Sequence, residues 1–145
     1  MANYLEHVQY VCSNLDTMVN FYCHVFDWPL RGRGKEVTAD RTYDWVHIGT
    51  DDSYVAFRLP YDGAAYSPDI GYRHNHIGIV VDDFERVLTH LEQLGVPVSI
   101  KGRHPYRSRA YFRDPDGYEV EVVHYHSNNP RKRNDYEIDA AGSQR

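Results

Sequence analysis

Residues 75–81 read NHIGIVV and residues 6–11 read EHVQYV, so a short β-branched run begins at a histidine twice in this chain. Each run ends at a turn containing Asn or Asp, residue types that can cap a helix. Each turn leads into a stretch with the 3.6-residue apolar rhythm of a helix, at residues 18–26 and 85–94. Each copy therefore predicts a strand, a turn and a helix in that order.

Strand-like segments follow each predicted helix. They lie at residues 43–48 and 54–59 in the first copy and at residues 96–100, 110–113 and 118–125 in the second. Turn-rich clusters at residues 49–53 and 114–117 separate the last two strands of each copy. The pattern predicts an α+β fold built from duplicated βαβββ modules, about residues 1–62 and 72–126 of one domain, 1–126.

Length and charge narrow the class of protein. A chain of 145 residues fits one domain and can bury a sizeable core. The net charge is −5, and no stripe of Lys and Arg interleaves with aromatic residues, so nucleic acid is not an expected partner. The sequence shows neither a signal-like start nor an apolar window long enough for a membrane span. We therefore expect a cytoplasmic protein without a membrane partner.

Two minor features complete the composition. Residues 127–145 are polar and include a basic triplet at 131–133, which predicts a C-terminal tail or an arm that reaches another subunit without adding to the core. Cys12 and Cys23 have no metal-binding or redox spacing and are too few for a disulfide framework. We expect both to be small, semi-buried thiols.

Strand alternation predicts where three side chains point. Successive side chains on a strand face opposite sides of the sheet. Glu121 alternates with apolar residues that suit a helix-packed layer, so it is expected in a polar cleft, and the same alternation places His7 and His76 on the cleft side of their strands. Two imidazoles and one carboxylate leave open coordination positions on a metal ion, as in non-haem iron enzymes. The sequence therefore predicts a divalent metal site, with Fe(II) favoured and Mn, Ni or Zn also fitting.

The other histidines are assigned from the same pattern. His24 and His90 fall on predicted helices, and His124 and His126 fall on the face opposite Glu121, so all four are expected to be structural. His74 shares the face of His76 and is kept as a reserve ligand.

At these residues the chain resembles the vicinal oxygen chelate superfamily, the group of glyoxalases, bleomycin-resistance proteins and extradiol dioxygenases. The resemblance covers residues 4–126, and its motifs are residues 6–8, 20–22, 75–77 and 114–118 leading to Glu121. It implies paired βαβββ modules that form a half-open, barrel-like mixed sheet around a divalent metal, with the helices outside. Many relatives complete the site by dimerisation, so a homodimer is expected.

The last strand of the first module reduces the number of superfamily reactions that fit this chain. Isomerases that this chain resembles carry a fourth ligand, Glu or Gln, on that strand, which here reads YVAFRL at residues 54–59. Alternation leaves Ala56 and Arg58 in the cleft, and a register one residue away would place Phe57 there. None of these side chains ligates a metal. The three-ligand relatives that remain are extradiol ring-cleaving dioxygenases and fosfomycin-resistance thiol transferases.

One stretch resembles the extradiol signature, from Gly102 to Glu121, and by that resemblance Tyr111 and His104 would line the substrate as catalytic groups. The function expected first is therefore an extradiol-type dioxygenase. The alternatives are a metal-dependent thiol transferase or lyase of the same superfamily, or a non-catalytic protein that binds an antibiotic or another small molecule.

Three further side chains, Arg58, His47 and Gln9, are expected to face a small-molecule substrate, which points to an aromatic or oxyanionic compound. Arg58 lies in the region where the dioxygenases carry an acid/base histidine. A permanently charged guanidinium cannot be that base, but it can clamp an oxyanion.

Overall fold

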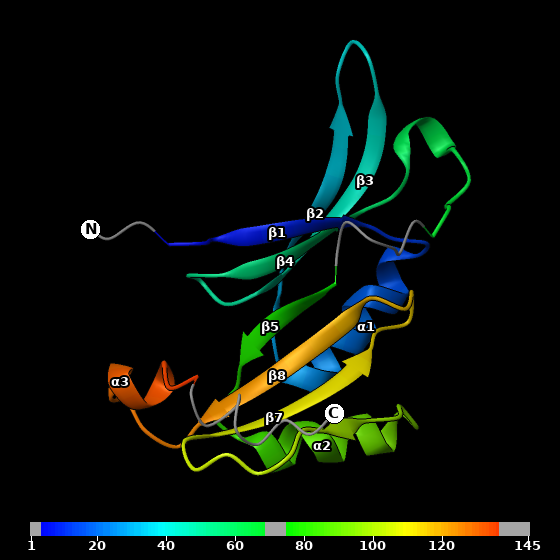
Figure 1. Ribbon diagram of the computed structural model, residues 1–145. Coiled ribbons are helices and arrows are strands. Elements are labelled where there is room, and N and C mark those ends of the chain that lie inside the picture. The colour runs from blue at the N-terminus through cyan, green and yellow to red at the C-terminus, as the bar shows by residue number, and fades with distance from the viewer. Residues whose placement is uncertain (1–3, 69–74, 137–145) are drawn as a thin grey trace. The chain divides into compact units, whose positions relative to one another are not determined.

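Both halves of the chain fold as the same five-element module, a strand, a helix and three further strands (Figure 1). The computed structural model describes residues 4–68 and 75–136. It divides into a first unit, residues 1–70 with 114–116, and a second unit, residues 71–113 with 117–145. The predicted duplicated βαβββ organisation is confirmed.

The first unit carries a four-stranded sheet with the order β1-β4-β3-β2. Its elements are β1 (His7–Val11), α1 (Leu15–Phe26), β2 (Leu30–Val37), β3 (Thr42–Gly49), β4 (Tyr54–Arg58) and a short 3-10 helix, η1 (Tyr61–Gly63). β1 and β4 are parallel, whereas β3 is antiparallel to both of its neighbours. Both strands predicted after the first helix are present as β3 and β4.

The second unit repeats this order as β5-β8-β7-β6. Its elements are β5 (His76–Val80), α2 (Phe84–Gln93), β6 (Ser99–Ile100), β7 (Arg107–Arg113), β8 (Glu119–Tyr125) and α3 (Pro130–Arg133). The strand predicted at residues 96–100 forms only at its end. Gly95 has a φ of 67°, and the Val96 N–H donates to the Leu91 carbonyl at 2.9 Å, so the chain is still closing α2 at that point.

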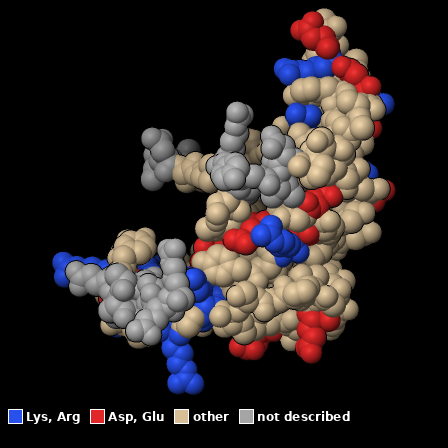
Figure 2. Space-filling model, turned by 45° about the vertical axis from the view of Figure 1, so that its right-hand side comes forward, with Lys and Arg blue, Asp and Glu red and all other residues tan. Residues whose placement is uncertain are grey.

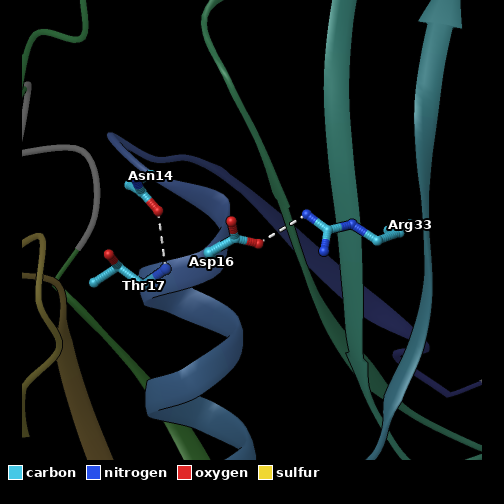
Figure 3. A network of polar contacts seen from close by, with 4 residues as sticks. All are labelled: Asn14, Asp16, Thr17 and Arg33. Atoms are coloured by element: carbon cyan, nitrogen blue, oxygen red, sulfur yellow. Dashed lines mark hydrogen bonds and ion pairs between the residues drawn. The ribbon is translucent and has the colours of Figure 1, made fainter.

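Both predicted helix caps are present. The Asn14 side chain accepts from the Thr17 N–H at 2.9 Å, as Figure 3 shows. The Asp83 side chain accepts from the Arg86 N–H at 3.0 Å. Each cap satisfies one of the N–H groups that a helix start leaves unpaired, which fixes where the strand ends and the helix begins.

Each helix covers one face of its own sheet. In the first unit, the Tyr22 ring of α1 lies 5.1 Å from the Phe57 ring of β4, and both side chains are fully buried. In the second unit, Leu91 of α2 is buried together with Val120 and Val122 of β8. Burial of such apolar side chains drives each module to fold and leaves the other sheet face for polar residues.

The strand β2 is not predicted by the sequence pattern. It reads LRGRGKEV, without an apolar alternation. The reason is the indole of Trp45 on the neighbouring strand. A Cβ at Gly34 would lie 2.9 Å from the Trp45 ring, and one at Gly32 would lie 3.6 Å from it. The glycines therefore leave space for the indole over β2. This contact with the neighbouring strand takes the place of apolar side chains on β2 itself, so the strand shows no apolar periodicity.

The described strands form two separate four-stranded mixed sheets that are not closed into a barrel. None of the described helices is long and apolar enough to cross a membrane. On the face shown in Figure 2, acidic side chains lie among the Lys and Arg side chains, which form no single continuous patch.

The part of the C-terminal segment that the structure describes, residues 127–136, forms a short helix and contacts β7. Residues 130–133 form α3, which has no buried residue. The Arg107 guanidinium, whose residue is only 4% exposed, donates to the carbonyls of Arg133 and Asp135, both at 2.9 Å. The segment therefore docks on β7 through backbone carbonyls and a buried cation.

Candidate metal centre

Glu121 is held from two sides in the second unit. Its Oε2 atom lies 3.2 Å from His76 Nε2 on the parallel strand β5, and its Oε1 atom accepts a hydrogen bond from the Tyr111 hydroxyl at 2.6 Å. Tyr111 stands directly opposite Glu121 in the antiparallel β7–β8 pair. Gly78 is the β5 partner of Glu121 and has no side chain to cover the carboxylate.

The imidazole of His76 is oriented by the residue before it. Its Nδ1 atom lies 2.5 Å from Asn75 Oδ1. An amide oxygen accepts only, so this contact suits a proton on Nδ1, and a neutral ring with that proton can bind a metal ion through Nε2. Metal-binding histidines are commonly fixed by an oxygen acceptor at the other ring nitrogen in this way.

His7 in the first unit has the same arrangement. Its Nδ1 atom lies 3.2 Å from Glu6 Oε2, so the residue before the histidine again supplies an oxygen. The ring is stacked on Tyr54 of β4, with centroids 4.8 Å apart and planes 12° apart. In both predicted ligand histidines, Nε2 is thus the ring nitrogen available to bind a metal ion.

The spacing of His76 and Glu121 is compatible with two ligands of one divalent metal ion. Two ligands bound about 2.1 Å from one ion at tetrahedral or octahedral angles lie roughly 3.0 to 3.4 Å apart. The 3.2 Å between His76 Nε2 and Glu121 Oε2 falls in this interval. The Tyr111 hydroxyl donates to the other carboxylate oxygen, Oε1, which favours binding of the ion through Oε2 alone.

The structure brings the predicted ligands together in part. His76 and Glu121 meet in the second unit, whereas His7 belongs to the first. Within residues 4–68 and 75–136, no three His, Cys, Asp or Glu side chains form a group that could hold a metal. The three-ligand set stays a prediction. The reserve ligand, His74, lies outside the described residues.

Tyr111 and His104, the two predicted catalytic residues, lie at opposite ends of β7. His104 is 7% exposed, forms an isolated bridge with Arg107 at the start of β7, and accepts from the Tyr106 N–H through Nδ1. Arg107 pairs with Tyr125, four residues along β8 from Glu121, which is roughly 13 Å at the usual rise of a strand. His104 is therefore not brought to Tyr111 and Glu121, because the loop before β7 folds back on its own strand.

The predicted substrate residues all lie on the first sheet. Gln9 of β1 pairs with Ala56, and His47 of β3 pairs with the same residue from the other side. Phe57 contacts α1, so the register that places Ala56 and Arg58 on the His7 face is the correct one. On this face of β4, Tyr54 pairs with His7 and Ala56 follows it, so neither position carries the Glu or Gln of a fourth ligand.

An aromatic row on this face was missed from the sequence. Rings follow one another from His7 to Tyr54, then to His47 at 4.6 Å and on to Trp45 at 4.4 Å. The Arg31 guanidinium lies 4.2 Å from the Tyr54 ring centroid. The row depends on the pairing of β4 with β1 and with β3, and the sequence pattern does not give the register of these long-range pairs.

Two side chains at the candidate site, His47 and Tyr111, have shifted pKa values. Burial, followed by the charges of His7 and Arg31, lowers the pKa of His47 below 6.5, so its ring is neutral at pH 7. Burial and the hydrogen bond to Glu121 raise the pKa of Tyr111 to about 12. Tyr111 therefore remains a hydrogen-bond donor to the carboxylate across the physiological range.

A separate cavity of about 410 Å³ lies beside the start of α1 in the first unit. Its lining includes Asp16 and Arg33, whose side chains form an ion pair of 2.9 Å across it (Figure 3). Both side chains are more than half exposed, so the pair contributes little stability. The lining residues do not include the candidate ligands.

Comparison with known proteins identifies the family. A sequence model of the Glyoxalase/Bleomycin resistance protein/Dioxygenase superfamily matches residues 4–122, and the chain belongs to this superfamily. The resemblance drawn from the histidine motifs is thereby confirmed.

Individual relatives are named for two activities. The chain is 25% identical to a lactoylglutathione lyase of Neisseria meningitidis serogroup B over 122 residues, 82% of this chain and 88% of the relative. It is 29% identical to the metallothiol transferase FosB of Shouchella clausii over 126 residues, 84% of this chain and 80% of the relative. These names favour the lyase or transferase alternative over the extradiol dioxygenase that the sequence placed first.

A solved structure shows the same fold. Glyoxalase I of Leishmania major superposes with a TM-score of 0.69 at 19% identity, covering 97% of this chain and 99% of that one. The α+β fold of the superfamily is therefore present in this chain.

Proposed function

We propose that the protein is a metal-dependent enzyme that adds a thiol to a small oxyanionic electrophile. The observation that carries the proposal is the orientation of His76, fixed at Nδ1 by Asn75 and facing Glu121 Oε2 at 3.2 Å through Nε2. His7, oriented in the same way by Glu6, is proposed as the third ligand. A bound divalent ion would supply a Lewis acid for a substrate oxygen.

The missing fourth ligand favours the transferase over the lyase. On the His7 face of β4, Tyr54 pairs with His7 and Ala56 follows it, so this face lacks a Glu or Gln that could bind the metal and accept a proton. The relative named as a thiol transferase is also 29% identical, against 23 to 27% for the relatives named as lyases. A lyase is kept as the second candidate because several relatives carry that name.

The protein side chains would act mainly by binding and orientation. Arg58 offers a guanidinium to an oxyanionic group at the far end of the substrate or of the thiol, and Gln9 and the neutral His47 offer hydrogen-bonding groups nearer His7 on the same face. In the reaction the thiol loses its proton, its sulfur forms a bond to carbon, and the oxygen released from that carbon takes up a proton. Tyr111 holds Glu121 in place.

The test compares Glu121→Ala with Glu119→Ala. Glu119 lies on the same strand and face but is paired with Arg113 at 3.6 Å, so it controls for the loss of an acid. Metal content by elemental analysis should be near one ion per chain in the wild type and in Glu119→Ala, and low in Glu121→Ala. Equal metal content in all three proteins would show that the site is misplaced.

A second measurement separates the reactions. Thiol-dependent consumption of an electrophilic phosphonate without oxygen is expected for the transferase, and conversion of a thiol–aldehyde adduct for the lyase. A strict requirement for oxygen would return weight to the dioxygenase. Elemental analysis of the same samples identifies the ion among Fe, Mn, Ni and Zn.

A further inference from the structure

The His7 face of the first sheet ends at two arginines that share one tyrosine. The Arg58 guanidinium carbon lies 3.8 Å from the Tyr61 ring centroid and 5.5 Å from that of Tyr43. The Arg41 guanidinium carbon lies 4.8 Å from the same Tyr61 ring, and its Nη1 atom donates to the Tyr61 hydroxyl at 3.1 Å. Both cations are thus held by aromatic rings.

Among residues 4–68 and 75–136, no acidic side chain neutralises either cation. Arg58 Nη1 donates to the Leu59 carbonyl at 3.0 Å, and in the part of the chain that the structure describes neither arginine forms an ion pair. Two like charges beside one ring repel each other, and an anion between them would remove that repulsion. Guanidinium groups present paired N–H donors that match the oxygens of carboxylates and phosphates.

The loop that carries Tyr61 is fixed to the end of the sheet. Asp62 adopts a left-handed φ of 55°, and its Oδ1 atom accepts from the Thr42 N–H at 2.8 Å. This contact ties η1 to the start of β3, next to Arg41. The two arginines are therefore positioned by backbone contacts as well as by ring stacking.

Their distance from His7 follows from the register. His7 pairs with Tyr54, and Arg58 lies four residues farther along β4 on the same face. At the usual rise of a strand this separation is roughly 13 Å. His47 and Trp45 line β3 alongside this stretch of β4. A molecule that contacts both ends must be extended.

We propose that Arg41 and Arg58 bind a terminal oxyanionic group, phosphate, phosphonate or carboxylate, of an extended substrate or co-substrate whose reacting end lies beside His7. The distance to the reacting end rests on the proposed function, whereas the anion site rests only on the two arginines and their rings. Arg41, on the β2–β3 turn, becomes a residue that determines specificity for the remote end of the molecule.

The experiment titrates the full chain with inorganic phosphate and, separately, with acetate while arginine Nε–Hε signals are recorded by NMR. The Arg41 and Arg58 signals should shift together and saturate. Arg41→Gln and Arg58→Gln should each weaken phosphate binding roughly tenfold, the change expected from losing one charge-assisted hydrogen bond. Arg33→Gln is the matched control, since Arg33 is paired with Asp16.

Each outcome decides one point. Shifts that do not saturate, or equal weakening in Arg33→Gln, would overturn the anion site, because general attraction to a cation would explain them. Tighter binding of phosphate or of acetate identifies the group that the site prefers. Phosphate binding is also measured in Glu121→Ala and in the wild type, to separate the two proposals. If the wild type takes up no metal but still binds phosphate, the anion site is supported and the proposed metal enzyme fails.

Discussion

The hydroxyl of Tyr111 is expected to control metal affinity through Glu121. Tyr111→Phe removes one oxygen atom and the 2.6 Å hydrogen bond to Glu121 Oε1. The carboxylate then loses the partner that orients it toward His76. Loss of such an outer partner typically weakens metal binding by about 10- to 100-fold, which is about 1.4 to 2.8 kcal/mol.

The assay is competition with a chromophoric chelator for Zn(II) or Mn(II). Tyr125→Phe makes the same chemical change at the far end of the hairpin, where the ring packs on Arg133 at 4.3 Å, and should leave affinity unchanged. If Tyr111→Phe binds metal as tightly as the wild type, or if both variants lose affinity equally, Tyr111 does not control metal affinity through Glu121.

The same variant distinguishes positioning from direct catalysis. If Tyr111 acts only by holding Glu121, saturating metal should restore the turnover of Tyr111→Phe. If the phenol contacts the substrate, as the extradiol resemblance implies, turnover stays low at full metal occupancy. Measuring kcat against metal concentration separates the two roles.

Three further predictions concern pH, docking and thiol reactivity. Because the folded-state pKa of His47 is lowered, its stabilising contribution is present above pH 6.5 and is lost as the pH falls through the folded pKa; His47→Gln should flatten that part of a pH series of urea unfolding curves. The Asp116 carboxylate accepts from the Ser13 N–H at 2.7 Å and from its hydroxyl at 2.6 Å, so Asp116→Ala should lower the free energy of unfolding by about 1 kcal/mol, and Ser13→Ala by less. Burial, followed by the charge of Asp116, raises the pKa of Cys12 to about 12, so iodoacetamide at pH 8 should label the partly exposed Cys23 first; equal labelling would show that Cys12 is accessible in solution.

Local signals were sufficient for most of the fold. The helix caps at Asn14 and Asp83 and the turn at residues 114–117 have short-range chemistry, and each was correctly located. β2 could not be predicted because its glycines make room for the Trp45 ring of β3, and local sequence does not show such a contact between strands. Strand prediction from alternation fails where a ring from a neighbour replaces the strand's own apolar side chains.

The part of the candidate site on the β7–β8 hairpin was predictable, because the turn fixes how the two strands pair. A hairpin that turns at residues 114–118 places Tyr111 opposite Glu121, so this pair could have been derived by counting. The location of His104 could not, because a buried histidine before a proline gives no sign of the way the loop folds. The aromatic row and the Arg41–Arg58 pair depend on the pairing of three strands and stayed hidden for that reason.

The two copies of the histidine motif are alike in geometry but differ in chemistry. Glu6 places a carboxylate on Nδ1 of His7, whereas Asn75 places a neutral amide on Nδ1 of His76. A carboxylate draws the Nδ1 proton more strongly and makes the opposite nitrogen a stronger electron donor. The repeated motif therefore carries two inequivalent imidazoles. If both bind one paramagnetic ion as proposed, two resolved sets of histidine ring signals are expected instead of one.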